Sequence, residues 1–146
     1  HLEYSRAIVE QVAVLCGGSP FLIQAFCHNL VLHMARQGRQ KVMPADLESV
    51  RREFMQPHDH TFAHMTEMLK GIANCVAGSL ARMAGAKRSG EVTWCQLGNA
   101  LPNIAPESLR AGLHLLVERD ILVQTAPDEW RFSSKLFQQW LAINAV

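Results

Sequence analysis

The clearest candidate for binding chemistry is a short corner of glycine, serine and proline between two predicted helices. It consists of Gly18, Ser19 and Pro20. A serine hydroxyl can accept an amide hydrogen bond at a helix start, and proline loses no bond at the first helical position. The amides exposed at such a start favour anionic groups. An ordinary glycine stop followed by a Ser-Pro start has the same sequence, so both interpretations stay open.

A group of histidines near the middle of the chain is the second candidate. His58, His60 and His64 lie near Asp59, and the second and third histidines would share one face of a helix. A zinc-protease motif would need a glutamate at the position of Thr61, and no cysteine is near in sequence. We therefore predict a solvated linker here and no metal site.

No serine, cysteine or histidine stands in a recognisable catalytic arrangement. The sequence also lacks a GxxxxGK[ST] phosphate loop, so the chain cannot by itself hold a triphosphate and its magnesium in the P-loop manner. We predict that it is not an enzyme on its own.

The cysteines form no CxxC pair and lie in apolar stretches, which predicts buried, reduced thiols. They are Cys16, Cys27, Cys75 and Cys95.

The charged residues that could contact DNA or a protein partner belong to residues 58–146. A helix predicted over 106–119 would present Arg110 and His114 outward. This part of the chain holds 8 basic against 8 acidic residues, whereas a DNA-binding face usually gathers an excess of cations. The other candidates would form a small basic patch beside a predicted hairpin: Lys87, Arg88, Arg131 and Lys135.

Composition places these candidates in a packed, globular protein. The 146 residues are 49% hydrophobic and 18% charged, with a formal net charge of +1. These values exclude a disordered chain and give no strong global attraction to nucleic acid or to an anionic membrane. No apolar run reaches the roughly 18 residues of a membrane helix, and no signal peptide is visible, so we expect a cytoplasmic protein. Because helical periodicity starts at once, without an initiator methionine, we expect a fragment of a longer protein.

Helical periodicity fills the first part of the chain. Apolar residues at helical spacing predict one helix over 4–15, a second that starts at Pro20 and ends at Gly38, and a third, shorter helix that opens at 43–47. We predict a helical bundle over 1–57, followed by a bridging helix or linker over 58–71.

The remaining residues, 72–146, have a different order of elements. The period of two over 121–125 and 129–133, with turn residues between them, predicts a β-hairpin. Helix, short helix, longer helix and then a two-stranded wing is the order of a winged-helix domain. The overall expectation is a mainly α fold with a small hairpin. The predicted helices of this part are 72–84, 95–101, 106–119 and 135–143.

Two stretches resemble a known group of proteins. Residues 16–24, CGGSPFLIQ, resemble the lid of AAA+-like ATPases of the STAND class and of the related archaeal-type ATPases, where a Gly-x-Pro motif opens a lid helix against the nucleotide. Residues 91–141, which read LHLLVERDIL over 113–122 and WRF over 130–132, are similar to the winged-helix domain that follows the lid. The resemblance covers most of the chain, in order.

The resemblance implies that Gly18, Ser19 and Pro20 contact a nucleotide, with the proline ring packed on adenine. ATP or ADP with Mg²⁺ would be bound by the full-length protein, whose P-loop domain would lie upstream in the same polypeptide. The chain departs from the group at two places. Many relatives have an arginine near the start of the lid helix, where this chain has Phe21, Leu22 and Ile23. Some members have a histidine after the wing, where this chain has Ser133 and Ser134.

These observations lead to one expected function and two alternatives. The expectation is a non-catalytic, regulatory C-terminal part of a STAND or AAA+-like ATPase, which couples nucleotide state to domain rearrangement and to a protein partner. The first alternative is a DNA-binding winged-helix regulator with a helical accessory domain. The second is an interaction module that uses the exposed side of the winged helix to hold a protein. No membrane partner is expected.

Overall fold

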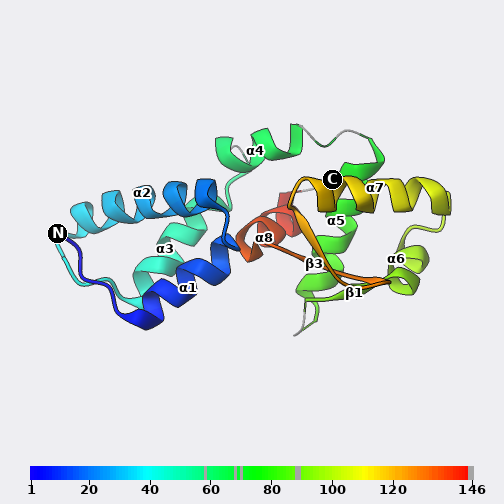
Figure 1. Cartoon of the computed structure of the whole chain (residues 1–146). Helices are drawn as coiled ribbons and strands as arrows, with labels where there is room; N and C mark the ends of the chain where they lie inside the picture. Colours follow the sequence, from blue (N-terminus) through cyan, green and yellow to red (C-terminus); the bar gives the residue numbers. More distant parts are fainter. Residues whose placement is uncertain (58, 68, 70, 88–89, 145–146) are drawn as a thin grey trace.

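The computed structural model describes residues 1–57, 59–67, 69, 71–87 and 90–144, so His58 and Arg88 lie outside it. Over the described residues the chain is mainly helical, with one small antiparallel sheet (Figure 1). The helices are α1 (Arg6–Cys16), α2 (Pro20–Gln37), α3 (Pro44–Phe54), α4 (His60–Glu67), α5 (Ile72–Gly85), α6 (Trp94–Ala100), α7 (Pro106–Glu118) and α8 (Lys135–Asn144). The strands are β1 (Val92–Thr93), β2 (Leu122–Ala126) and β3 (Glu129–Phe132).

Helix α1 begins two residues later than the periodicity predicts. Residue Glu3 is extended instead, because its amide donates to the Gln40 carbonyl at 2.8 Å and its carbonyl accepts from the Val42 amide at 3.0 Å. Ser5 then caps α1 by accepting from the Ile8 amide at 3.3 Å. The N-terminal segment is thus tied to the connection between α2 and α3.

The predicted hairpin is confirmed, and a third strand joins it. The sheet order is β1-β3-β2, with both pairs antiparallel, so β3 is central. The short extended segment before α6 supplies β1, where Val92 pairs with Trp130. Thr93 ends this strand and caps α6 reciprocally: its hydroxyl accepts from the Gln96 amide at 3.3 Å, and its amide donates to Oε1 of Gln96 at 3.0 Å.

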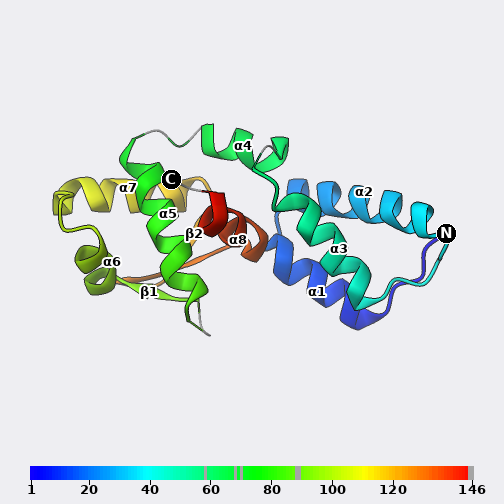
Figure 2. The same cartoon turned by 180° about the vertical axis from the view of Figure 1, so that it is seen from behind.

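Helix α8 lies between the first three helices and the sheet-bearing part, as the front and back views show (Figures 1 and 2). It packs on α5 and also contacts α1 and α3. The buried side chains therefore form one continuous cluster that includes residues from both parts of the chain.

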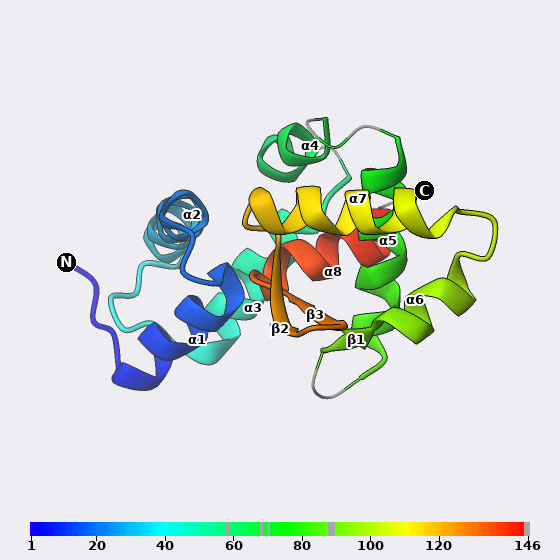
Figure 3. The ribbon, with the colours of Figure 1, turned by 45° about the vertical axis from the view of Figure 1, so that its right-hand side comes forward.

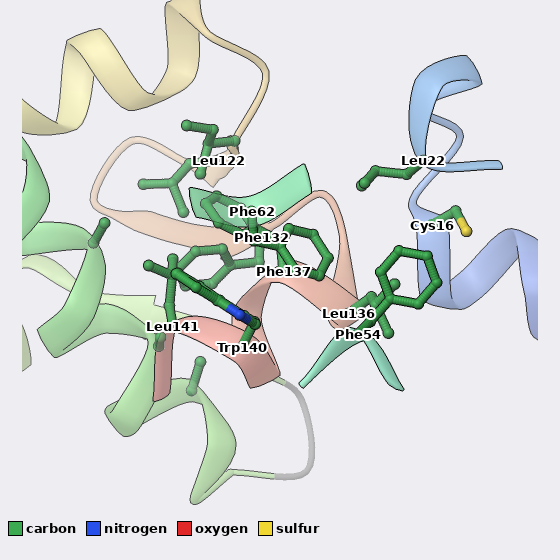
Figure 4. Close-up of a cluster of buried hydrophobic side chains, with 14 of the residues drawn as sticks. Cys16, Leu22, Phe54, Phe62, Leu122, Phe132, Leu136, Phe137, Trp140 and Leu141 are labelled. Carbon is green, nitrogen blue, oxygen red and sulfur yellow. The ribbon is translucent and has the colours of Figure 1, made fainter. Parts of the chain in front are cut away.

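An aromatic group closes the core where α3, α4 and α8 meet (Figure 4). Phe62 of α4 is fully buried there. Its ring centroid lies 5.9 Å from that of Phe54, 5.4 Å from Phe137 and 5.7 Å from Trp140. These separations are typical of favourable aromatic pairs. The bridging segment predicted over 58–71 thus contributes a helix that packs into the core.

The prediction of four buried cysteines is wrong for Cys75 and Cys95, which are exposed, and Cys27 is only partly buried. Both lie in helices whose buried faces point the other way, since α5 buries Val76 and α6 buries Leu97. Cys16 is buried, and this burial, reinforced by the neighbouring Cys27, raises the pKa of its thiol to about 11. None of the helices in the described ranges is long and apolar enough to cross a membrane.

Candidate functional site

The glycine-serine-proline corner forms the turn between α1 and α2. Gly17 and Gly18 both have left-handed backbones, with φ of 63° and 75°. Ser19 accepts from the Leu22 amide at 3.4 Å, and Pro20 is the first residue of α2. The capping geometry predicted from the sequence is confirmed. It also leaves the proline ring exposed at the start of the helix.

The corner faces a hollow of about 490 Å³ between α2 and the sheet-bearing part of the chain. Figure 3 shows the turn after α1 beside the start of β2 and the end of β3. The hollow is bounded by the corner, by the turn after α7, by the segment after β3 and by one side chain of α4. Its lining residues are Gly17, Gly18, Ser19, Pro20, Leu22, Met65, Arg119, Asp120, Ile121, Val123, Ser133, Ser134 and Phe137.

One wall of the hollow is a close contact between backbones. A Cβ atom added to Gly17 would lie 1.6 Å from the carbonyl oxygen of Ser133, so only glycine fits here. Beside it, the Ser134 hydroxyl donates to the Leu15 carbonyl at 3.0 Å and accepts from the Phe137 amide at 3.2 Å. The end of α1 is therefore fitted directly to the start of α8.

The Ser134 contact gives a first prediction. Replacing Ser134 with alanine is expected to lower the free energy of unfolding by about 1.5 kcal/mol, because the Leu15 carbonyl and the Phe137 amide each lose a partner at a largely buried site. Urea titration followed by tryptophan fluorescence measures this loss. Ser49→Ala is the control, since that hydroxyl only donates to the carbonyl of Ala45 in its own helix. An equal effect of the two substitutions would contradict the assigned role of Ser134.

The hollow combines an apolar floor with two charged side chains. Leu22, Ile121 and Phe137 are buried beneath it. Arg119 and Asp120 lie at the turn after α7, and neither side chain forms an ion pair or hydrogen bond with the described residues. The volume lies within the usual range of small-molecule sites, about 300–1,000 Å³. The hollow can take a flat, largely apolar ring system with a charged substituent.

The residues that line the hollow suit the base and the phosphate of a nucleotide better than the magnesium ion that accompanies it. Pro20 and the apolar floor offer surfaces for a base, and Arg119 offers a partner for phosphate. Among the described residues that line the hollow, Asp120 is the one carboxylate. In the part of the chain that the structure describes, no group of three or more His, Cys, Asp or Glu side chains could hold a metal ion.

The predicted histidine group is only partly described, because His58 lies outside the described residues. His60 and His64 are exposed on α4, one turn apart. Nδ1 of His64 lies 4.0 Å from a carboxylate oxygen of Glu67.

Two of the predicted contact residues on α7 meet at a small hollow of about 240 Å³ against the hairpin. The guanidinium of Arg110 lies 4.0 Å from the centroid of the Trp94 ring and 3.4 Å from a carboxylate oxygen of Asp128. Nε2 of His114 lies 3.1 Å from the carboxylate of Glu118. Both side chains stay exposed and lie beside an acidic neighbour.

The remaining predicted contact residues lie apart from α7. The ammonium of Lys87 donates to Oε1 of Gln96. Arg131 is exposed on β3. Lys135 lines a separate hollow of about 520 Å³ between α1, α3 and α8. The structure therefore does not gather these residues into one hollow, and Arg88 lies outside the described residues.

Sequence reasoning missed Arg119 and Asp120 as site residues. They lie about 100 residues from the corner in sequence, and only the packing of α8 against α1 and α5 brings them beside it. The signal that could have found them is their position directly before the first strand of the predicted hairpin, whose two ends must lie side by side. The Ser133 hydroxyl makes that link by donating to the carbonyls of Asp120 and Ile121.

Comparisons with known proteins give no match: no protein family, no curated protein and no solved structure matches the chain.

Proposed function

We propose that this chain is the regulatory part of a STAND or AAA+-like ATPase, in which residues 1–57 act as the lid and residues 72–146 form a winged-helix domain. In this proposal the chain performs no chemistry itself. It closes over a nucleotide held by a P-loop domain of the same polypeptide, and it passes the nucleotide state to a protein partner. ATP or ADP with Mg²⁺ would be the ligand of the whole protein.

The observation that carries the proposal is the shared hollow. Pro20, from the proposed lid, and Ser133, from the segment after the proposed wing, line the same space of about 490 Å³. A ligand bound there would contact both parts of the chain at once. Since a ligand shifts a conformational equilibrium only through contacts that differ between states, a site at such a junction is well placed for a switch.

The fit between Gly17 and Ser133 supports the coupling. Because the two backbones touch, the end of α1 cannot move toward the hairpin without displacing it. Packed interfaces of this kind shift between discrete arrangements rather than deforming continuously. Movement of the lid would thus be transmitted to α8 and the sheet.

Titration of the chain with ADP, followed through backbone amide resonances, tests the proposal. We expect shifts confined to the hollow, at Gly18, Ser19, Ser133 and Ser134, and weak binding because the chain would supply only one side of the site. We also expect no ATP hydrolysis by the chain alone. Amide shifts scattered over the surface, or hydrolysis at an ordinary enzymatic rate of about 1 s⁻¹ or more, would contradict the proposal.

A mobility-shift experiment with duplex DNA at low salt tests the first alternative, a DNA-binding winged-helix regulator. Residues 58–146 hold 8 basic against 8 acidic residues, so this part of the chain has no net positive charge to attract DNA phosphates. We therefore expect no tight complex. Tight binding that is lost when Arg110, Arg131 and Lys135 are neutralised would favour a DNA-binding winged helix instead.

A further inference from the structure

We infer that Arg119 is the residue that contacts phosphate in the corner hollow, and that the hollow prefers a nucleoside phosphate to inorganic phosphate. The inference rests on the proposed function for the nature of the ligand, and it assigns a role to a residue outside the lid motif. Arg119 follows α7 directly, and its side chain lines the hollow together with Pro20.

The charge of Arg119 distinguishes it from the other described residues that line the hollow. Among the described residues that line the hollow, it is the one cation. It is exposed, and it has no ion-pair partner among the described residues, whereas Arg110 of α7 lies against Trp94 and Asp128. A planar guanidinium can pair with phosphate through two parallel hydrogen bonds. Arg119 is therefore free to take an anionic ligand.

Within the described residues, the corner and the segment after β3 contain no substitute for this arginine. The first turn of α2 continues from Pro20 with Phe21, Leu22 and Ile23, none of which carries a charge. The segment after β3 offers Ser133 and Ser134, whose hydroxyls are already bonded to backbone groups. A phosphate in the hollow would thus meet its cation on the turn after α7.

The turn is held in place by the hairpin. Asp120 has a left-handed backbone with φ of 58°, which is unusual outside glycine, and its carbonyl accepts from the Ser133 hydroxyl. This bond fixes the position of the preceding Arg119 relative to Ser133. A residue kept in this region of backbone space by its surroundings is a feature often found at binding sites.

The carboxylate of Asp120 makes the site selective. Its negative charge offsets part of the attraction of Arg119 for a small free anion such as inorganic phosphate. A nucleotide has a further source of affinity, because its base can cover Pro20 and the apolar floor while its sugar hydroxyls donate to the carboxylate. The combination favours a nucleoside phosphate over inorganic phosphate.

Amide-detected titrations of the intact chain with ADP, adenosine and inorganic phosphate test this assignment in three proteins: wild type, Arg119→Gln and Arg131→Gln. Arg131 is the matched control, because it is an exposed arginine on the neighbouring strand that does not line the hollow. We expect Arg119→Gln to weaken ADP binding about fivefold and to leave adenosine binding unchanged. Arg131→Gln should leave both unchanged, and inorganic phosphate should bind more weakly than ADP.

The outcomes separate this inference from the proposed function. If ADP still shifts the corner amides of Arg119→Gln with wild-type affinity, the role of Arg119 is overturned while the nucleotide-facing corner stands. If both arginine variants lose ADP binding equally, only overall charge is at work and the assignment is overturned. If inorganic phosphate binds as tightly as ADP, the nucleoside class is overturned. If ADP leaves the wild-type corner unshifted, the inference and the proposed function both fail.

Discussion

Replacing Gly17 with alanine is expected to lower the free energy of unfolding by about 3 kcal/mol. Two costs add. The left-handed backbone, with φ of 63°, disfavours any residue with a Cβ by about 1 kcal/mol. The new Cβ would also lie 1.6 Å from the Ser133 carbonyl oxygen, and relieving such overpacking costs a further 1–3 kcal/mol or so. Because the obstacle is backbone rather than a flexible side chain, the hairpin itself must move.

Gly18→Ala provides a matched control one residue away. Gly18 also has a left-handed backbone, with φ of 75°, but no atom lies within 4 Å of the position that its Cβ would take. Its substitution should therefore cost only the backbone contribution of about 1 kcal/mol. Urea unfolding monitored by tryptophan fluorescence compares the two. Equal losses would show that the fit between Gly17 and Ser133 contributes nothing to stability.

A second measurement follows the movement of the hairpin. In Gly17→Ala the amide resonances of 132–137 should shift, because Ser133 and Ser134 must retreat from the end of α1. Gly18→Ala should leave these resonances in place. These shifts report directly on the contact between the end of α1 and the segment after β3. They do not depend on how far the substitution destabilises the protein.

Local sequence signals predicted the elements well where the determinants are local. Ser19 and Pro20 mark the start of α2 because capping and the fixed proline φ act within one turn. The turn residues between 121–125 and 129–133 marked the hairpin, and β3 has the predicted period of two, whereas β2 buries only Leu122. The start of α1 was misplaced, because the bridge between Glu3 and Lys41 is a contact between distant segments.

The candidate site was predictable only in part. The corner could be found because glycine, serine and proline indicate a turn by their own conformational preferences. Its opposite wall could not, since Arg119 and Asp120 reach the corner only through the packing of α8 against α1 and α5. The exposure of Cys75 was missed for a related reason. Apolar neighbours in sequence do not reveal which side of a helix its partners cover, and α5 is covered by α7 and α8 on the other side.

The largest loss of stability is expected from Asp46→Asn, at about 3–4 kcal/mol. Asp46 is buried at the start of α3 and collects three donors. Its Oδ1 accepts from Nε2 of His33 at 3.0 Å and from the guanidinium of Arg39, and its Oδ2 accepts from the Met43 amide at 2.8 Å. An asparagine would place an NH₂ group against at least one of these donors. Breaking a buried charged pair by removing one partner typically costs about 3–5 kcal/mol, and the partial exposure of Arg39 puts this case at the lower end.

Glu53→Gln is the matched control for loss of one acidic charge. Glu53 pairs with Arg36 at 3.0 Å, but both side chains are largely in solvent, and exposed pairs contribute about 0–1 kcal/mol. Urea unfolding at neutral pH should therefore separate the two variants clearly. A loss for Asp46→Asn no greater than that for Glu53→Gln would mean that the hydrogen bonds that Asp46 accepts contribute nothing to the stability of the chain.

The same carboxylate should make the stability of the chain fall in acid. Burial acts to raise the pKa of Asp46, but hydrogen bonds from Met43, His33 and Arg39 together outweigh it, so the pKa in the folded chain lies below the usual value. The unfolded chain therefore binds a proton first. This contribution to stability is complete above the unfolded pKa of about 3.9 and is lost as the pH falls through the folded one.

Glu48 adds to the same acid transition, because its hydrogen bond from Arg51 lowers its pKa to about 2. The difference in unfolding free energy between wild type and Asp46→Asn isolates Asp46, since Glu48 is present in both. We expect this difference to shrink steadily as the pH falls below about 4. A difference that did not change with pH would show that Asp46 stabilises the chain through its shape alone, and that the charge on the carboxylate is not what joins α2 to α3.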